Sequence, residues 1–194
     1  MYQKLGKRTF DIILAVTGLT ILLPLFILIS PILWVHFKGK PFFCQPRPGL
    51  HEKVFTLLKF RSIPEHVTES GDSAISAIGN FLRKTSLDEL PQLWNVLRGD
   101  MSFVGPRPLL TEYLPMYSPY QRLRHSVLPG ITGLAQVNGR NSIGWAEKFE
   151  YDLQYVQNQS FLLDLKILFL TIERIITRRG INDPDNGYVK KFQG

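Results

Sequence analysis

The sequence has a single cysteine, Cys44, which excludes an internal disulfide framework and any zinc site built from several cysteines. Its four histidines are scattered and form no HxxxH pair, which argues against a zinc enzyme. The glycine-rich signatures of dinucleotide-binding and P-loop proteins are also missing. With 44% apolar and 20% charged residues in 194, the chain is too apolar to be disordered, and it is long enough for one domain plus an anchor.

Charge is absent from one long stretch, between Ile12 and Phe37. These 26 residues exceed the roughly 20 that a helix needs to cross a bilayer. A cleaved signal peptide would have a shorter apolar core that ends in small residues, whereas this stretch ends in Trp34, His36 and Phe37. Two interpretations remain: a helix that spans the membrane, and a re-entrant helix that enters and leaves the same leaflet.

Two features favour the re-entrant helix. Pro24 in mid-segment, and Ser30 followed by Pro31, interrupt regular helical hydrogen bonding and predict a break. Basic residues lie on both sides of the segment: Lys4, Lys7 and Arg8 before it, and Lys38, Lys40 and Arg47 after it. Since positive charge marks the cytoplasmic side, both ends are expected there. A net charge of +7 placed mainly around this segment indicates an anionic membrane surface as partner, and no nucleic acid.

The rest of the chain predicts short strands and amphipathic helices. Phe42–Gln45 and Val54–Phe60 flank a Pro-Gly turn at 47–50, which is typical of a β-hairpin. Leu90, Leu93, Trp94 and Leu97 have helical spacing, as do Leu162, Leu165, Phe169, Ile172 and Ile176, and a short helix is expected over 78–84. The late helix could lie in the core or on the membrane. The expected fold is α+β and mainly helical, with a re-entrant membrane anchor over 1–40 and a compact cytosolic domain over 41–194.

Chemistry is expected where one of these helices starts. Ser86 followed by Glu89 fits a capping box, and Asp88 would then fall in the first turn, where the ionised carboxylate is favoured. Capping alone explains this pattern. The functional alternative is that Asp88 and Glu89 hold a divalent metal, or that Asp88 acts as a nucleophile.

Basic side chains elsewhere could neutralise phosphate groups beside such a metal, although a solvated surface position explains any single one of them. The candidates are Lys59, Arg61, Arg83 and Arg107. Gln136, Asn138 and Arg140 lie on a glycine-bearing stretch that could bind a ligand, although a tight-turn role explains it equally well. Phosphates that meet Mg²⁺ held by carboxylates form the usual arrangement for phosphoryl transfer.

Several motifs of this sequence together resemble the bacterial sugar transferases, in particular the small monotopic phosphoglycosyl transferases of the PglC type. The matching segments are KFRS at 59–62, SLDELPQ at 86–92, LRGDMSFVGPRP at 97–108 and PGITG at 129–133. The resemblance covers nearly the whole chain. Ser62 and Ile63 depart from the Thr-Met that the family pattern has after Lys-Phe-Arg, which weakens any inference about sugar choice.

The resemblance implies a reaction and a location. Family members move a sugar 1-phosphate from a UDP-sugar to undecaprenyl phosphate and release UMP, by a ping-pong, Mg²⁺-dependent mechanism through a phosphosugar-aspartate. Asp88 matches the nucleophile, Glu89 its metal-associated partner, and Lys59 and Arg83 match residues near the phosphates. Pro24 matches the break in the re-entrant helix, so the catalytic domain would face the cytoplasm from the bacterial inner membrane.

Some alternatives stay open at this point. A glycosyltransferase that moves the sugar alone would release UDP, and a non-catalytic membrane scaffold would need only the capping box. The candidate donors are UDP-N,N′-diacetylbacillosamine, UDP-GlcNAc, UDP-GalNAc, UDP-glucose and UDP-galactose, and the resemblance to small members favours an N-acetylated or diacetamido sugar. The sequence fixes neither the glycoconjugate made downstream nor the oligomeric state, and a homodimer is one arrangement that it allows.

Overall fold

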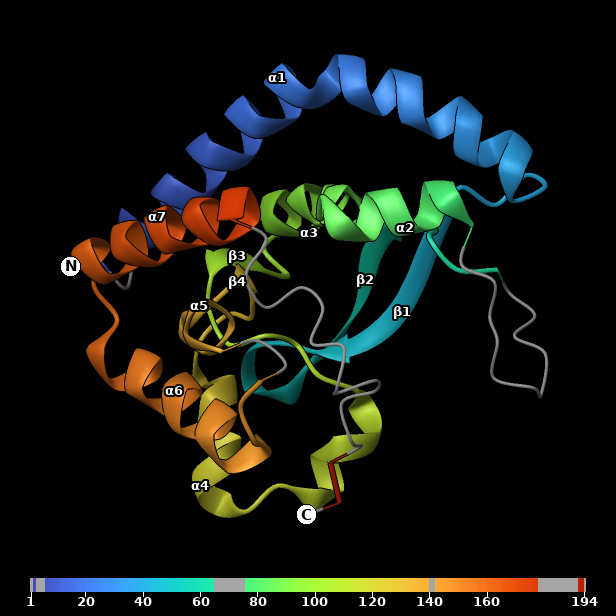
Figure 1. Cartoon of the computed structure of the whole chain (residues 1–194). Coiled ribbons are helices and arrows are strands. Elements are labelled where there is room, and N and C mark those ends of the chain that lie inside the picture. Colours follow the sequence, from blue (N-terminus) through green and yellow to red (C-terminus); the bar gives the residue numbers. More distant parts are fainter. Residues whose placement is uncertain (1, 3–5, 65–75, 140–141, 178–191, 194) are drawn as a thin grey trace.

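The computed structural model describes residues 2, 6–64, 76–139, 142–177 and 192–193. Its longest element is helix α1 (Lys7–His36), whose 30 residues correspond to about 45 Å. Helical structure continues through Pro24 and Ser30, and Figure 1 shows α1 curving as an arch over the rest of the molecule. Among the described residues, α1 is the one helix long and apolar enough to cross a membrane. The fold is mainly helical with little β-structure, as the sequence predicts.

The first turns of α1 are attached to the domain by buried polar contacts. The Lys7 ammonium lies 2.7 Å from the carboxylate of Asp164, and both side chains are buried. One turn later, a carboxylate oxygen of Asp11 accepts hydrogen bonds from the Ser102 hydroxyl and the Phe103 N–H, each at 3.0 Å. Because buried charges are costly unless they are paired, these contacts fix where α1 begins.

The far end of α1 returns to the same domain through apolar contacts. Ile29 and Leu33 belong to one buried cluster with Phe60 and Leu82. Between the two attachment points the outer face of the helix is not covered by any other described element, and Ile21 is 70% exposed. Both ends of this apolar helix therefore contact the same domain, and its middle arches over α7 and α3 (Figure 1).

The predicted hairpin is confirmed, with a longer first strand than expected. β1 (Phe42–Pro48) pairs with β2 (Val54–Phe60) in antiparallel register. The turn predicted at 47–50 is wrong by two residues, because Arg47 and Pro48 continue β1, and the connection carries a short 3-10 helix, η2 (Leu50–Glu52). Proline is tolerated there since β1 is an edge strand of a two-stranded sheet.

The expected helix over 86–98 is divided into two elements. η3 (Leu87–Glu89) is a single 3-10 turn, and α3 (Gln92–Arg98) begins after Pro91. Ser86 has φ +57°, in the left-handed region, and its side chain caps nothing, so the predicted capping box is wrong. Gly99 ends α3 with φ +88°, in the left-handed region that glycine adopts readily at a helix C-terminus.

The remaining described elements complete a layer beneath α1 and a second layer below it (Figure 1). They are α2 (Ala77–Lys84), β3 (Ser102–Val104), η4 (Thr111–Met116), α4 (Pro119–Arg122), η5 (Leu123–Ser126), β4 (Gly130–Thr132), α5 (Leu134–Asn138), α6 (Trp145–Asn158) and α7 (Phe161–Thr177). β3 and β4 form a small parallel pair that the sequence did not indicate. In Figure 1, α7, α3 and α2 lie at one level under the arch.

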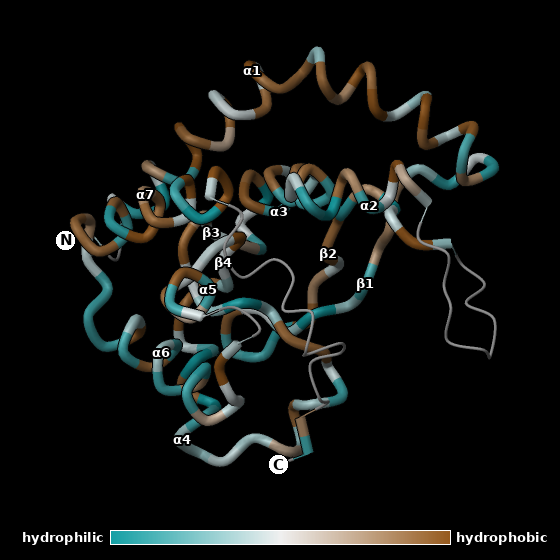
Figure 2. The backbone as a smooth tube through the Cα atoms, viewed as in Figure 1, coloured by the Kyte–Doolittle hydropathy of each residue, from teal (hydrophilic) through white to brown (hydrophobic). Residues whose placement is uncertain are grey.

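The apolar stripe of the late helix faces outward. On α7, Leu162, Phe169 and Ile176 are 76%, 77% and 74% exposed, whereas Asp164 and Ile167 are buried. Figure 2 shows hydrophobic residues concentrated in α1 and α7 and hydrophilic ones in α6. An amphipathic helix with its apolar face uncovered is typical of a membrane surface rather than a core.

The buried pair that begins α1 gives a prediction about stability. Replacing Lys7 with Ala leaves the fully buried Asp164 carboxylate without its cation, so the free energy of unfolding should fall by about 3–5 kcal/mol. Urea unfolding in detergent micelles, followed by far-UV circular dichroism, measures this change. Lys166→Ala, on an exposed position of α7, is the matched control and should alter it by less than about 0.5 kcal/mol. Equal effects of the two variants would contradict the role given to Lys7.

Candidate active site

The two adjacent acids of η3 have different surroundings. Glu89 accepts through one carboxylate oxygen, Oε1, from the Lys59 ammonium at 2.6 Å and from the Arg107 guanidinium at 2.8 Å. Asp88 is half-buried and forms no hydrogen bond or ion pair with any residue that the structure describes. The left-handed conformation of Ser86 turns the chain into the single helical turn that carries both acids. One acid is therefore held in place, and the other is available to a ligand.

The pKa of Glu89 follows from its two cations. Burial alone would raise it, but the charges and hydrogen bonds of Arg107 and Lys59 outweigh burial and lower the pKa of Glu89 to about 2. Glu89 in turn raises the pKa of Arg107, while burial lowers the pKa of Lys59 against the opposing attraction of Glu89. At neutral pH the three groups form a charged cluster with Glu89 ionised.

The pKa of Asp88 moves in the opposite direction. Burial raises it first of all, and the charge of Glu89 adds to this effect, while Lys59, Arg107 and Arg83 oppose it. Burial therefore opposes the ionised form of Asp88, and η3 is a single 3-10 turn in which the Ser86 side chain makes no capping hydrogen bond. Further positive charge beside Asp88 would favour its carboxylate form.

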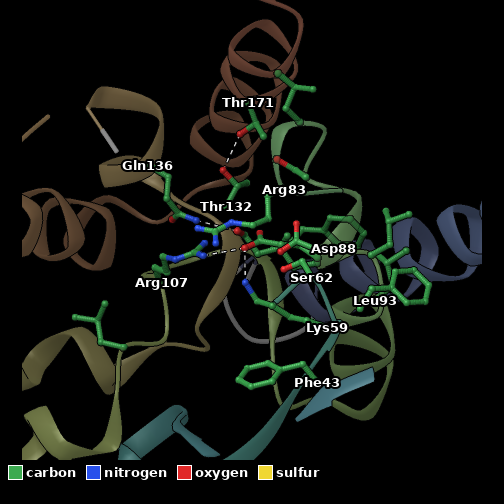
Figure 3. A pocket seen from close by; sticks show the side chains of 18 of the residues that line it. Phe43, Lys59, Ser62, Arg83, Asp88, Leu93, Arg107, Thr132, Gln136 and Thr171 are labelled. Carbon is green, nitrogen blue, oxygen red and sulfur yellow. Dashed lines mark hydrogen bonds and ion pairs between the residues drawn. The ribbon is translucent and has the colours of Figure 1, made fainter. Parts of the chain in front are cut away.

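A cavity of about 1160 Å³ contains these groups. Figure 3 shows Asp88, Lys59, Arg83 and Arg107 converging on a common space. The cavity is also lined by apolar residues of three helices: Gly18 and Leu22 of α1, Leu93 of α3 and Ile175 of α7. One space thus joins the charged groups around Glu89 to an apolar region beneath α1.

Two of the predicted ligand-binding residues line the cavity, but their side chains already donate hydrogen bonds to backbone carbonyl groups. Arg61 donates to the carbonyl oxygens of Lys40 and Phe42, at 2.9 and 3.2 Å, and so ties the base of the hairpin to the chain that follows α1. Gln136 donates to the carbonyl of Ile131 at 2.8 Å. Both side chains lie where they could contact a ligand. Some of their N–H groups, however, are already used in hydrogen bonds that stabilise the fold.

Asn138 lies away from these groups: it is exposed, donates to the Leu134 carbonyl within α5 and does not line the cavity. Arg140 lies outside the described residues. The cavity wall also contains a buried ion pair that the sequence did not indicate, between Arg124 and Asp152. No local pattern could have indicated it, because the two residues lie 28 positions apart in different elements.

The donor set around Asp88 suits Mg²⁺ in one respect. Among the described residues there is no cluster of three or more metal-ligating side chains, so the chain does not supply an all-protein cage. Mg²⁺ commonly uses one or two carboxylates and takes its other oxygens from substrate phosphates and water. Asp88 fits such a role, because its carboxylate has no partner among the described residues, whereas Oε1 of Glu89 already binds two cations.

Comparisons with known proteins identify the family of the chain. The family model for bacterial sugar transferases matches residues 2–178. The chain is 45% identical to an uncharacterized sugar transferase, EpsL, of Bacillus subtilis, over 97% of this chain and 96% of the relative. It is 39% identical to the undecaprenyl-phosphate glucose phosphotransferase of Komagataeibacter xylinus, over 92% of this chain and 37% of the relative. It is 38% identical to the undecaprenyl-phosphate galactose phosphotransferase of Salmonella typhimurium, over 90% of this chain and 41% of the relative. The chain therefore belongs to the bacterial sugar transferase family.

Proposed function

We propose that the protein transfers a sugar 1-phosphate from a UDP-sugar to undecaprenyl phosphate, with release of UMP. The observation that carries this proposal is Asp88, an acid that pairs with no other described residue, in a cavity lined by Lys59, Arg83 and Arg107. Relatives named as undecaprenyl-phosphate sugar phosphotransferases support it, although the chain spans only about two fifths of their length. The apolar wall under α1 suits a lipid acceptor in the same cavity.

In the proposed first half-reaction, a carboxylate oxygen of Asp88 bonds to the phosphorus that carries the sugar. The bond from that phosphorus to the bridging oxygen breaks, and UMP leaves with the oxygen and its electron pair. In the second, a phosphate oxygen of undecaprenyl phosphate bonds to the same phosphorus, and the bond to Asp88 breaks. The products are undecaprenyl-diphospho-sugar and a regenerated Asp88 carboxylate, so atoms and charge balance.

The other groups act on charge and position. Lys59, Arg83 and Arg107 lie where they can neutralise the phosphates, and Glu89 holds two of these cations in place. Mg²⁺ bound by Asp88 and Glu89 with the donor's phosphates would supply further charge neutralisation at the leaving group. Fixed groups of this kind lower the barrier because they need not reorganise during the reaction.

We further propose that α1 is re-entrant, that residues 1–40 anchor the protein and that 41–194 form a cytosolic catalytic domain at the bacterial inner membrane. Support comes from the two attachments of α1, Lys7 to Asp164 at its start and Leu33 in the cluster with Phe60 at its end, which place both ends against one domain. The exposed stripe of α7 would rest on the same leaflet. The lipid phosphate would then enter the cavity at headgroup depth.

The donor is the least constrained part of this proposal. Relatives carry glucose and galactose in their names, while resemblance to the small transferases points to N-acetylated or diacetamido sugars. The reaction would be the first membrane step of glycoconjugate assembly with any of these donors.

The covalent step predicts a mass change on one residue. Incubation with Mg²⁺ and a panel of the five UDP-sugars, without lipid acceptor, should add one sugar phosphate to the wild-type protein and none to Asp88→Asn. Undecaprenyl phosphate added afterwards should remove the adduct. Intact-protein mass spectrometry measures both steps, and thermal unfolding shows whether the variant is folded.

The same assay separates the alternatives. Release of UDP instead of UMP would indicate transfer of the sugar alone. UMP release without any adduct would indicate direct displacement between donor and acceptor. Neither nucleotide released with any donor, in the presence of lipid, would favour a non-catalytic scaffold.

The geometry predicts unequal roles for two residues that the sequence placed in one group. Arg107→Ala removes a cation from Glu89 and from the phosphate region, so kcat/KM should fall about 100-fold or more. Asn138→Ala removes only a bond within α5, so kcat/KM should stay within about twofold. Initial rates of UMP release measure both, and equal losses would contradict the assigned cavity.

The re-entrant helix predicts that both its ends are on the cytoplasmic side. One protein keeps the exposed Cys44 as its single cysteine, and a second carries Cys44→Ser and one cysteine in an N-terminal tag. A membrane-impermeant maleimide should label neither protein in intact spheroplasts and both after permeabilisation. Labelling of the tag in intact spheroplasts would show a spanning helix.

A further inference from the structure

The segment 106–108, with the sequence Pro-Arg-Pro, is held by all three of its carbonyl oxygens. The first accepts from the N–H of Gly130 in β4 at 3.0 Å, and the last accepts from the Arg47 guanidinium in β1 at 3.2 Å. The middle carbonyl, that of Arg107 itself, accepts from Nη2 of Arg124 at 2.8 Å. Since proline also restricts φ at two of the positions, little backbone freedom remains.

Arg124 is itself firmly held. It is 2% exposed, and its Nε and Nη2 lie 3.0 and 2.6 Å from one carboxylate oxygen of Asp152 on α6. The rings of Tyr117 and Phe149 lie 5.9 and 5.7 Å from the centre of the guanidinium. Nη2 donates to both Asp152 and the Arg107 carbonyl, and Nε adds a second bond to Asp152 that a lysine, with its single nitrogen, would lose.

This arrangement connects α6 to the ion pairs of Glu89 through the carbonyl group of Arg107. The backbone at Arg107 is fixed by Arg124, and the side chain of Arg107 extends from that point to Glu89 at 2.8 Å. A shift of about 1 Å in a catalytic group can cost on the order of 100-fold in rate. We propose that Arg124 and Asp152 are positioning residues, which set the Arg107 guanidinium against Glu89 and the phosphates of the donor.

The proposal rests on the proposed transferase activity, and a double-mutant cycle tests it. Arg124→Lys should lower kcat for UMP release about 10-fold in the otherwise wild-type protein, with little change in KM. In the Arg107→Ala background, where nothing is left to position, Arg124→Lys should change the residual kcat less than about twofold. The donor is the UDP-sugar that forms the adduct in the mass assay. Arg122→Lys is the matched control, because that neighbouring guanidinium binds Glu52 and the Leu114 carbonyl.

A second readout needs no substrate. In the full-length protein, a dicarbonyl reagent that modifies arginine should react with Arg107 about fivefold faster in Arg124→Lys than in wild type or Arg122→Lys, as measured by peptide mass mapping. Absence of activity in wild type would refute the transferase proposal, while this measurement would still test the positioning role.

Three results would overturn the inference. They are equal losses of kcat from Arg124→Lys in both backgrounds, no loss in the wild-type background, and an unchanged modification rate at Arg107. If thermal unfolding shows that Arg124→Lys does not fold, Asp152→Asn and Arg47→Lys replace it in the double-mutant cycle. Asp152→Asn weakens the hold on Arg124, and Arg47→Lys weakens the bond to the Pro108 carbonyl.

Discussion

The shared ion pair of Glu89 is the interaction on which the site depends. Lys59 comes from the hairpin and Arg107 from the segment after β3, and both bind the same oxygen of Glu89. Without that carboxylate, two cations would face each other in a partly buried space. With it, the hairpin, η3 and the Pro-Arg-Pro segment meet at one carboxylate. Asp88 lies beside this carboxylate and has no partner of its own among the described residues.

The same principle attaches the membrane helix. Polar contacts are buried where this apolar helix joins its domain. Lys7 pairs with Asp164, and Asp11 accepts hydrogen bonds from Ser102 and Phe103. They specify position in a way that apolar contacts alone do not, because an unpaired buried charge is strongly unfavourable. The arch of α1 therefore has a defined start, and the cavity beneath it has a defined wall.

Local sequence signals predicted part of the fold, and the 14-residue α6 was not among the predicted elements. Extended segments around a Pro-Gly turn indicated the hairpin, helical spacing indicated α3 and α7, a short helix was expected at α2, and the uncharged segment indicated α1. The errors arose where one pattern fits two structures. Ser86 with Glu89 fits a capping box, but tertiary attraction from Lys59 and Arg107 claims the Glu89 side chain and Ser86 adopts a left-handed conformation. The β3–β4 pair was missed because strands of three residues carry too little pattern.

The sequence by itself determined the kinds of group available: an apolar anchor, adjacent acids and a set of scattered basic residues. Only the tertiary structure decided which acid is paired and which is free, since the partners of Glu89 lie 30 and 18 positions away along the chain. It likewise placed Gln136 at the cavity and Asn138 away from it, because residues two apart on a helix such as α5 point to nearly opposite sides. Residue type is local information, whereas the charge state and partners of a side chain depend on what the fold brings beside it.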